Sequence, residues 1–129
     1  MNRELKGRVP VLKNDICERT FDFSVRIVKL CRFLDEQAGV SRTLSKQLIR
    51  SGTSIGANVE EAQGGQSRAD FLSKISIACK EARETLYWLK LLEATEAVPD
   101  DRLKEIRTEA NELVGILTAI IKSTKEKTR

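Results

Sequence analysis

Apolar side chains recur every three or four residues along most of this 129-residue chain, and that spacing constrains the fold more than any other feature. The first stripe advances by 4, 3, 4, 3 and 4 residues, the spacing of one buried helix face. Its members are Ile16, Thr20, Phe23, Ile27, Leu30 and Leu34. Three similar stripes follow, and alternation typical of β-strands is scarce. The spacing predicts helices over residues of about 15–37, 42–63, 68–95 and 100–124.

Residues that start or stop helices stand at most of these boundaries. The candidate caps are Asn14, Asp15, Ser41 and Ser67, the last with Asp70 three residues on. The candidate stops are Gly39 and Gly64, and Pro99 precedes the last segment. The tail from Lys125 is expected to fray. Four helices of about 20 residues with short connections favour a single all-α domain over residues 1–129, an antiparallel up-down-up-down four-helix bundle.

The second predicted helix contains a weak middle section. Gly52 and Gly56 lie inside it, and each glycine costs on the order of 1 kcal/mol relative to alanine. The compensation that we expect is a close approach of a neighbouring helix to a face of small residues.

The composition excludes several classes of chemistry. The chain has no histidine, which removes Ser-His-Asp and Cys-His catalysis and the commonest zinc ligand sets. Its three cysteines form no CxxC pair, and free thiols in a reducing cytoplasm are the simplest interpretation. No signal peptide or long apolar run is present, so we expect a cytoplasmic protein without a membrane partner. We expect no enzyme activity, cofactor or metal.

Two helices carry apolar residues away from their main stripes. Such extra faces predict homo-oligomerisation, and the alternative is that a thick bundle buries them as ordinary core. The predicted oligomer-interface residues are Phe21, Val25 and Val28 on the first helix and Ile77, Trp88 and Leu91 on the third.

Basic residues gather on the first two helices, within a net charge of +4 for the chain. They could form a phosphate-binding surface with a salt-dependent affinity for nucleic acid. The candidates are Arg19, Arg26, Lys29, Arg32, Arg42, Lys46 and Arg50. By composition alone a solvated face is favoured, because Glu18, Asp22 and Glu36 share the first helix's charged side.

Several polar residues have an expected structural role. Asn58 lies beside apolar positions and must find partners, either on the backbone or on a carboxylate across the bundle. Ser54, Glu61 and Glu81 are placed in the same structural class, and no base stands ready to activate Ser54 as a nucleophile.

From Arg50 onward the sequence resembles a known family, encoded within intervening sequences of bacterial 23S ribosomal RNA genes and also called S23 ribosomal proteins. The matching segments are Arg50-Ser51-x-x-Ser54-Ile55-x-x-Asn58-Val59-x-Glu61-Ala62, Ser67-x-Ala69-Asp70-Phe71-x-x-Lys74 and Ile77-Ala78-x-Lys80-Glu81-Ala82-x-Glu84-x-x-Tyr87-Trp88-Leu89-x-Leu91-Leu92. Ala62 replaces the family's usual glycine and Glu60 a small residue, which affects local packing.

The resemblance implies a four-helix bundle that assembles into a ring-shaped homopentamer, without an established enzymatic activity. It also implies a link to RNA, because the related accessory variability determinant of diversity-generating retroelements is a basic pentamer associated with reverse transcriptase and RNA. The favoured hypothesis is a non-enzymatic oligomer that binds RNA or an RNA-containing complex. The alternative is a protein-interaction scaffold that does not bind nucleic acid.

Overall fold

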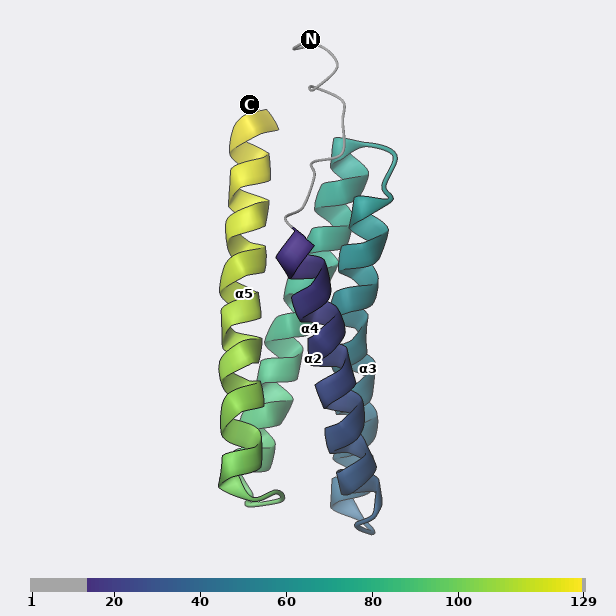
Figure 1. The fold of residues 1–129 in the computed structure, drawn as a ribbon, viewed down its shortest axis with the longest axis vertical. Helices are drawn as coiled ribbons and strands as arrows, with labels where there is room; N and C mark the ends of the chain where they lie inside the picture. Colours follow the sequence, from purple (N-terminus) through teal and green to yellow (C-terminus); the bar gives the residue numbers. More distant parts are fainter. Residues whose placement is uncertain (1–13, 129) are drawn as a thin grey trace.

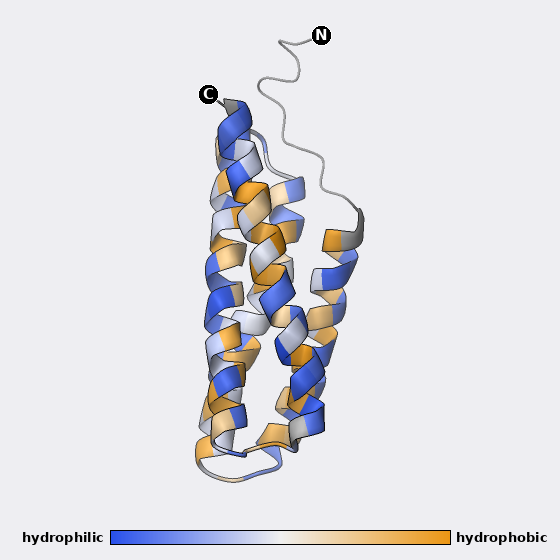
Figure 2. Cartoon of the chain, turned by 90° about the vertical axis from the view of Figure 1, so that its left-hand side faces the viewer, coloured by the Kyte–Doolittle hydropathy of each residue, from blue (hydrophilic) through white to orange (hydrophobic). Residues whose placement is uncertain are grey.

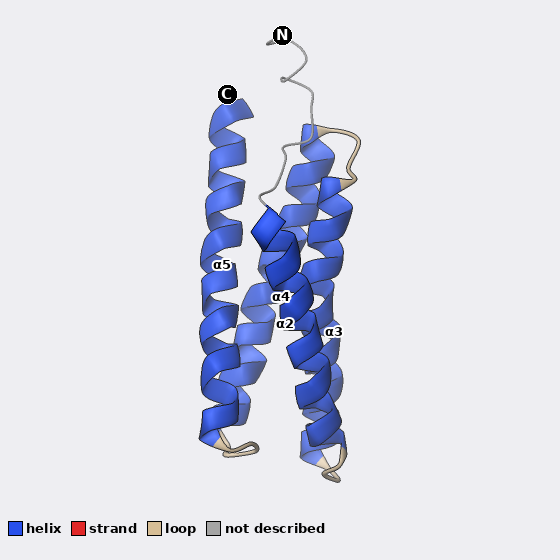
Figure 3. Cartoon of the chain, viewed as in Figure 1, coloured by secondary structure: helices blue, strands red, loops and turns tan. Residues whose placement is uncertain are grey.

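The computed structural model describes residues 14–128, which form four helices joined by short loops (Figure 1, Figure 3). They are α2 (Asn14–Asp35), α3 (Val40–Gln63), α4 (Arg68–Ala94) and α5 (Asp100–Thr128). The predicted all-α four-helix bundle is therefore confirmed. The predicted single domain over residues 1–129 includes residues 1–13 and 129, which lie outside the described part of the chain.

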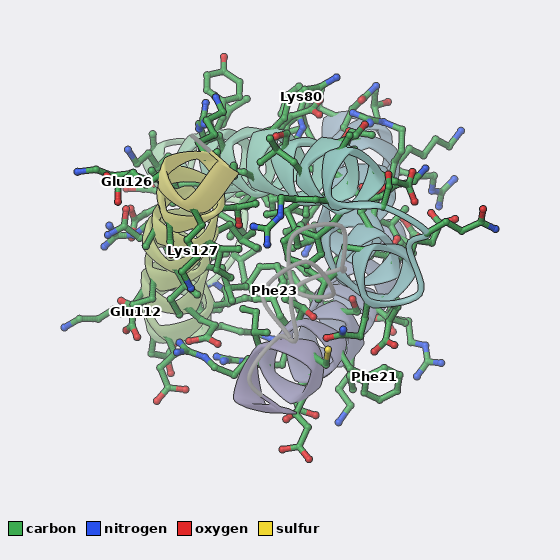
Figure 4. The ribbon with its side chains drawn as sticks, turned by 90° about the horizontal axis from the view of Figure 1, so that it is seen from above. Phe21, Phe23, Lys80, Glu112, Glu126 and Lys127 are labelled. Atoms are coloured by element: carbon green, nitrogen blue, oxygen red, sulfur yellow. The ribbon has the colours of Figure 1, made fainter. Side chains whose placement is uncertain are left out.

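Each helix packs against the next one along the chain, in the up-down-up-down order (Figure 1). The seams α2–α3, α3–α4 and α4–α5 are extensive, whereas α2 and α5 approach each other at far fewer residues. Figure 4 shows the four helices around a common interior, into which Phe23 points while Phe21 points outward. The fourth seam thus contributes much less backbone contact than the other three.

The helix ends agree with the predictions at some boundaries and differ at others. Ser67 caps α4, since its hydroxyl accepts a hydrogen bond from the Asp70 amide at 3.0 Å. Ser41 is not the cap of α3. Gly39 takes that position with φ +84°, a left-handed conformation that suits glycine, and its carbonyl accepts from the Arg42 amide.

The helix α5 continues to Thr128, beyond the predicted end at about residue 124. Thr124 is buried and anchors the end of this helix, and its hydroxyl donates to the Ile120 carbonyl at 2.7 Å. Lys125 and Lys127 then lie in the last turn, where positive charge complements the carbonyl end of a helix.

The predicted stripes form the core. Every member of the first stripe is buried, including Thr20, whose hydroxyl donates to the Ile16 carbonyl at 2.9 Å. Hydrophobic and hydrophilic residues alternate along each helix in Figure 2, as expected for helices with one buried face. None of the helices in residues 14–128 contains an apolar stretch that could span a lipid bilayer.

The two glycines of α3 lie where α2 approaches most closely. A Cβ at Gly52 would lie 2.8 Å from Cγ1 and Cγ2 of Ile27, and one at Gly56 would lie 3.1 Å from the Thr20 carbonyl oxygen. Seven residues before Gly52 on α3, Ser45 Oγ donates to the Cys31 carbonyl of α2 at 3.3 Å. The expected close approach to a small-residue face is confirmed.

Replacing Gly52 by alanine is expected to destabilise the protein, although alanine favours a helix by about 1 kcal/mol. Ile27 is fully buried and its Cβ branch cannot move aside, so the added methyl overpacks the α2–α3 seam at a cost of about 1–3 kcal/mol. Gly115→Ala is the matched control, because nothing lies within 4 Å of a Cβ there. Chemical denaturation of both variants provides the measurement. Equal stabilisation by the two substitutions would contradict the close-packing explanation.

Candidate nucleic-acid interface and oligomer faces

Two of the predicted phosphate-binding arginines lie in the sparse seam between α2 and α5. Arg19 Nε donates to Glu109 Oε2 at 2.9 Å, and its Nη2 contacts both Glu109 and Glu112. The hydrogen bond to Glu109 is the main reason that the pKa of Arg19 is raised. Arg26 lies 3.8 Å from Glu105 one heptad further along α2. These side chains connect the two helices, and their charge is compensated within the bundle.

Arg50 is compensated in the same way, in the α3–α4 seam. Its Nη1 lies 3.5 Å from Glu81 Oε2 and its Nη2 donates to Glu84. The Glu81 residue is only 8% exposed, so this carboxylate depends on Arg50 for its countercharge. Beside it the hydroxyls of Ser51 and Thr85 lie 2.9 Å apart and are both buried. The cluster joins α3 to α4 through polar contacts.

The other predicted cations are exposed, and no described residue forms an ion pair with any of them. We call this set the turn cluster, because it occupies the C-terminal half of α2 and the start of α3, on either side of their connecting turn. The turn cluster consists of Lys29, Arg32, Arg42 and Lys46. The Arg42 guanidinium also donates to the Asp35 carbonyl at 3.2 Å, which holds it beside the turn.

The predicted oligomer-interface residues lie on two helices, α2 and α4, and differ in their exposure. On α2, Phe21 is 64% exposed, Val25 is exposed and Val28 is half-buried. On α4, Ile77 is exposed, whereas Leu91 is half-buried and Trp88 packs partly against the core. The Trp88 Nε1 atom is buried and has no hydrogen-bond partner among the described residues. The bundle therefore buries only part of these two extra faces.

Phe21 borders a hollow of about 380 Å³ between α2 and α3. Its lining is apolar and acidic, with no cation among the residues that form it. They are Cys17, Glu18, Phe21, Asp22 and Glu60. Since phosphate groups are repelled by carboxylates, this end of the α2–α3 face does not suit nucleic acid.

The predicted structural polar residues occupy different environments. Asn58 Nδ2 donates to the Ser54 carbonyl at 2.8 Å, and Ser54 Oγ donates to the Ser51 carbonyl at 3.0 Å. Both therefore bond to the backbone of α3 itself. Glu61 is exposed, whereas Glu81 is buried beside Arg50.

The cysteines are not poised as nucleophiles. Burial raises the pKa of Cys17 and of Cys31 above the ordinary value of 9.0, which disfavours the reactive thiolate at neutral pH. Cys79 is fully buried. Among residues 14–128 no group of three acidic, cysteine or histidine side chains is arranged to hold a metal ion.

The sequence interpretation missed a second basic surface, on the outward face of α4. Lys80, Arg83, Tyr87 and Lys90 are all exposed there. Their spacing of 3, 4 and 3 residues places them on one side of the helix and was the available signal.

Comparisons with known proteins identify a matching family and a similar solved structure. The family model described as 23S rRNA-intervening sequence protein matches residues 12–119. A crystal structure of a protein of unknown function from the S23 ribosomal protein family of Bacteroides thetaiotaomicron is 46% identical, with a TM-score of 0.77. The similarity covers 83% of this chain and 98% of that one. The search of curated protein sequences found no significant match.

Replacing Arg50 by glutamine is expected to lower the free energy of unfolding by about 1–3 kcal/mol, because Glu81 would remain buried without its cation. Lys46→Gln on the same helix is the control, since Lys46 is exposed and is expected to change stability by less than about 0.5 kcal/mol. Urea denaturation of the two variants compares them directly. A loss no greater for Arg50→Gln than for Lys46→Gln would show that the cluster does not stabilise the α3–α4 seam.

Proposed function

Because the chain belongs to the family of 23S rRNA-intervening sequence proteins, we propose that it is a non-enzymatic, cytoplasmic adaptor that binds RNA or an RNA-containing complex as a homo-oligomer. The observation that carries the proposal is the turn cluster. Four exposed cations lie at one end of the bundle, and no carboxylate among the described residues is paired with them. Positive charge of this kind attracts the phosphate backbone without regard to sequence.

The proposal modifies the surface expected from the sequence. Arg19, Arg26 and Arg50 are already bound to carboxylates within the bundle, so their contribution to an anionic partner is reduced. The turn cluster supplies the phosphate contacts instead. Each chain then offers few contacts, and a ring of subunits would repeat them and raise the affinity through multivalency.

Self-assembly is the second part of the proposal. The exposed apolar residues of α2 and those of α4 lie on different faces, and an interface between two unlike faces is the kind that closes into a ring. The ring of five implied by the family resemblance is the assembly that we propose.

A protein-interaction scaffold is the alternative function, and one observation favours it. Phe21 is 64% exposed beside an acidic hollow, which fits an apolar partner surface bearing cations better than it fits RNA. A protein that forms the oligomer but binds no RNA at low salt would be assigned this function.

Binding of structured RNA is expected to weaken steeply with salt, by about 0.7–0.9 in log affinity per log salt for each phosphate contact. Removing two of those contacts with Lys29→Gln/Lys46→Gln should lower the affinity and reduce the slope by about 1.4–1.8. The control, Lys104→Gln/Lys122→Gln, removes two exposed charges from α5 and should leave binding near wild type. Fluorescence anisotropy at two salt concentrations makes the comparison. Absence of binding at low salt, or affinity indifferent to salt, would refute the RNA-binding proposal.

Light scattering at micromolar concentration is expected to give the mass of an oligomer, five times 14.5 kDa for the proposed ring. Phe21→Ser should reduce this mass because it removes an exposed apolar side chain from the α2 face, while leaving the helical content unchanged. Val40→Ser provides the control, since Val40 is 74% exposed and outside both faces. A monomeric wild type would refute self-assembly, and an unchanged mass for Phe21→Ser would exclude the α2 face from the interface.

A further inference from the structure

The outward face of α4 carries a basic stripe with an aromatic residue in its middle, formed by Lys80, Arg83, Tyr87 and Lys90. We propose that this stripe binds single-stranded RNA, with its cations on phosphates and a base stacked on Tyr87. The inference rests on the proposed RNA-binding function and adds a second, distinct surface to it. Figure 4 shows α4 and α2 on opposite sides of the bundle, so the stripe is not an extension of the surface on α2.

No acidic side chain interrupts the stripe. The exposed residues that share this side of α4, Ala69, Ser73, Ser76 and Ala94, are uncharged. The nearby carboxylates of α4 are turned to neighbouring helices: Glu81 and Glu84 pair with Arg50 of α3, and Glu93 lies 3.1 Å from Arg107 of α5. The positive charges of the three stripe cations are therefore not offset by these carboxylates.

This arrangement contrasts with α2. There the exposed acids Glu18 and Asp22, and Glu36 directly after the helix, lie among the cations and have no arginine partner in the described bundle. The stripe on α4 is thus the more uniformly positive of the two helix faces, and charge complementarity favours a polyanion there. Arg83 is also partly oriented, because its Nη2 lies 3.3 Å from the Sγ atom of buried Cys79.

Tyr87 is placed to act as a stacking platform. It is 58% exposed, and its ring meets that of Trp88 edge to face, with centroids 5.2 Å apart and planes at 71°. Trp88 packs against the core, so the contact restricts the Tyr87 ring before any ligand arrives. A base can stack on such a ring whatever its identity.

The aromatic residue selects single strands over duplexes. Bases in a duplex are stacked on one another and cannot reach a side chain on a convex helix surface, whereas unpaired bases can. From Lys80 to Lys90 the helix rises about 15 Å, which suits a short stretch of extended strand. An acidic peptide would match the charge but would not need the exposed ring.

The test measures binding of a fluorescently labelled 12-nucleotide oligouridine by anisotropy. Tyr87→Ala is expected to weaken binding about tenfold without changing the salt slope, and Tyr87→Phe should restore it, because stacking needs only the ring. Lys80→Gln/Lys90→Gln should weaken binding and reduce the slope by about 1.4. The matched control Lys104→Gln/Lys122→Gln removes the same charge from α5.

Trp88 is the only tryptophan, so its emission should change on binding in the wild type and not in Tyr87→Ala.

The outcomes separate this inference from the function on which it rests. If neither the oligouridine nor structured RNA binds the wild type at low salt, the proposed function fails and the inference fails with it. If RNA binds and Lys29→Gln/Lys46→Gln weakens it while the Tyr87 and Lys80/Lys90 variants behave as wild type, only the stripe is overturned. Equal losses in every charge variant with no effect of Tyr87→Ala would indicate diffuse attraction, and preferential binding of a polyglutamate peptide would indicate a protein partner. Either result overturns the inference.

Discussion

The close contact between α2 and α3 is the constraint on which the rest of the bundle depends. At Gly52 and Gly56 the two helices approach until no side chain fits between them, and Ile27 and the Thr20 carbonyl fill the space that a Cβ would occupy. Two glycines inside a helix weaken it by about 1 kcal/mol each, and the packing that they permit offsets this cost. The position of α2 against α3 then determines which side chains of both helices remain outside.

Ion pairs between helices decide which charges remain available to a partner. The α2–α5 seam has little backbone contact, and Arg19 and Arg26 bridge it to acids on α5. Arg50 does the same between α3 and α4, where buried Glu81 needs a cation. These arginines pair with acids across the seams, whereas the turn cluster, the α4 stripe and the lysines of α5 remain exposed. The surface that an anionic partner meets is therefore smaller than the number of basic residues suggests, but also less interrupted by acids on α4.

The aromatic residues that lie at or beyond the edge of the core also differ in their surroundings. Trp88 contributes part of its surface to the core and supports Tyr87, whereas Phe21 stands away from the interior beside carboxylates. One aromatic residue on each side of the bundle thus lies in an electrostatic environment of opposite sign. Under the proposals made above, RNA would occupy the basic stripe of α4, and another copy of the chain would join the α2 face around Phe21 to the exposed apolar residues of α4.

The sequence by itself determined the class of fold. The 3–4 spacing of apolar residues, the Ser67 cap and the Gly64 stop are local signals, and each acts over a few residues, so the four helices and most of their ends could be predicted. Only the tertiary structure decided which basic residues remain unpaired and so form the candidate site. Pairing between residues such as Arg19 and Glu109, ninety positions apart, depends on how the helices are arranged in space, and a helical wheel drawn for one helix cannot reveal it. The same holds for the acids of α4, whose neutralisation by α3 and α5 leaves Tyr87 in a positive field. Whether a charge is paired and whether a side chain is buried depend on the residues that surround it in space, and the fold determines those residues.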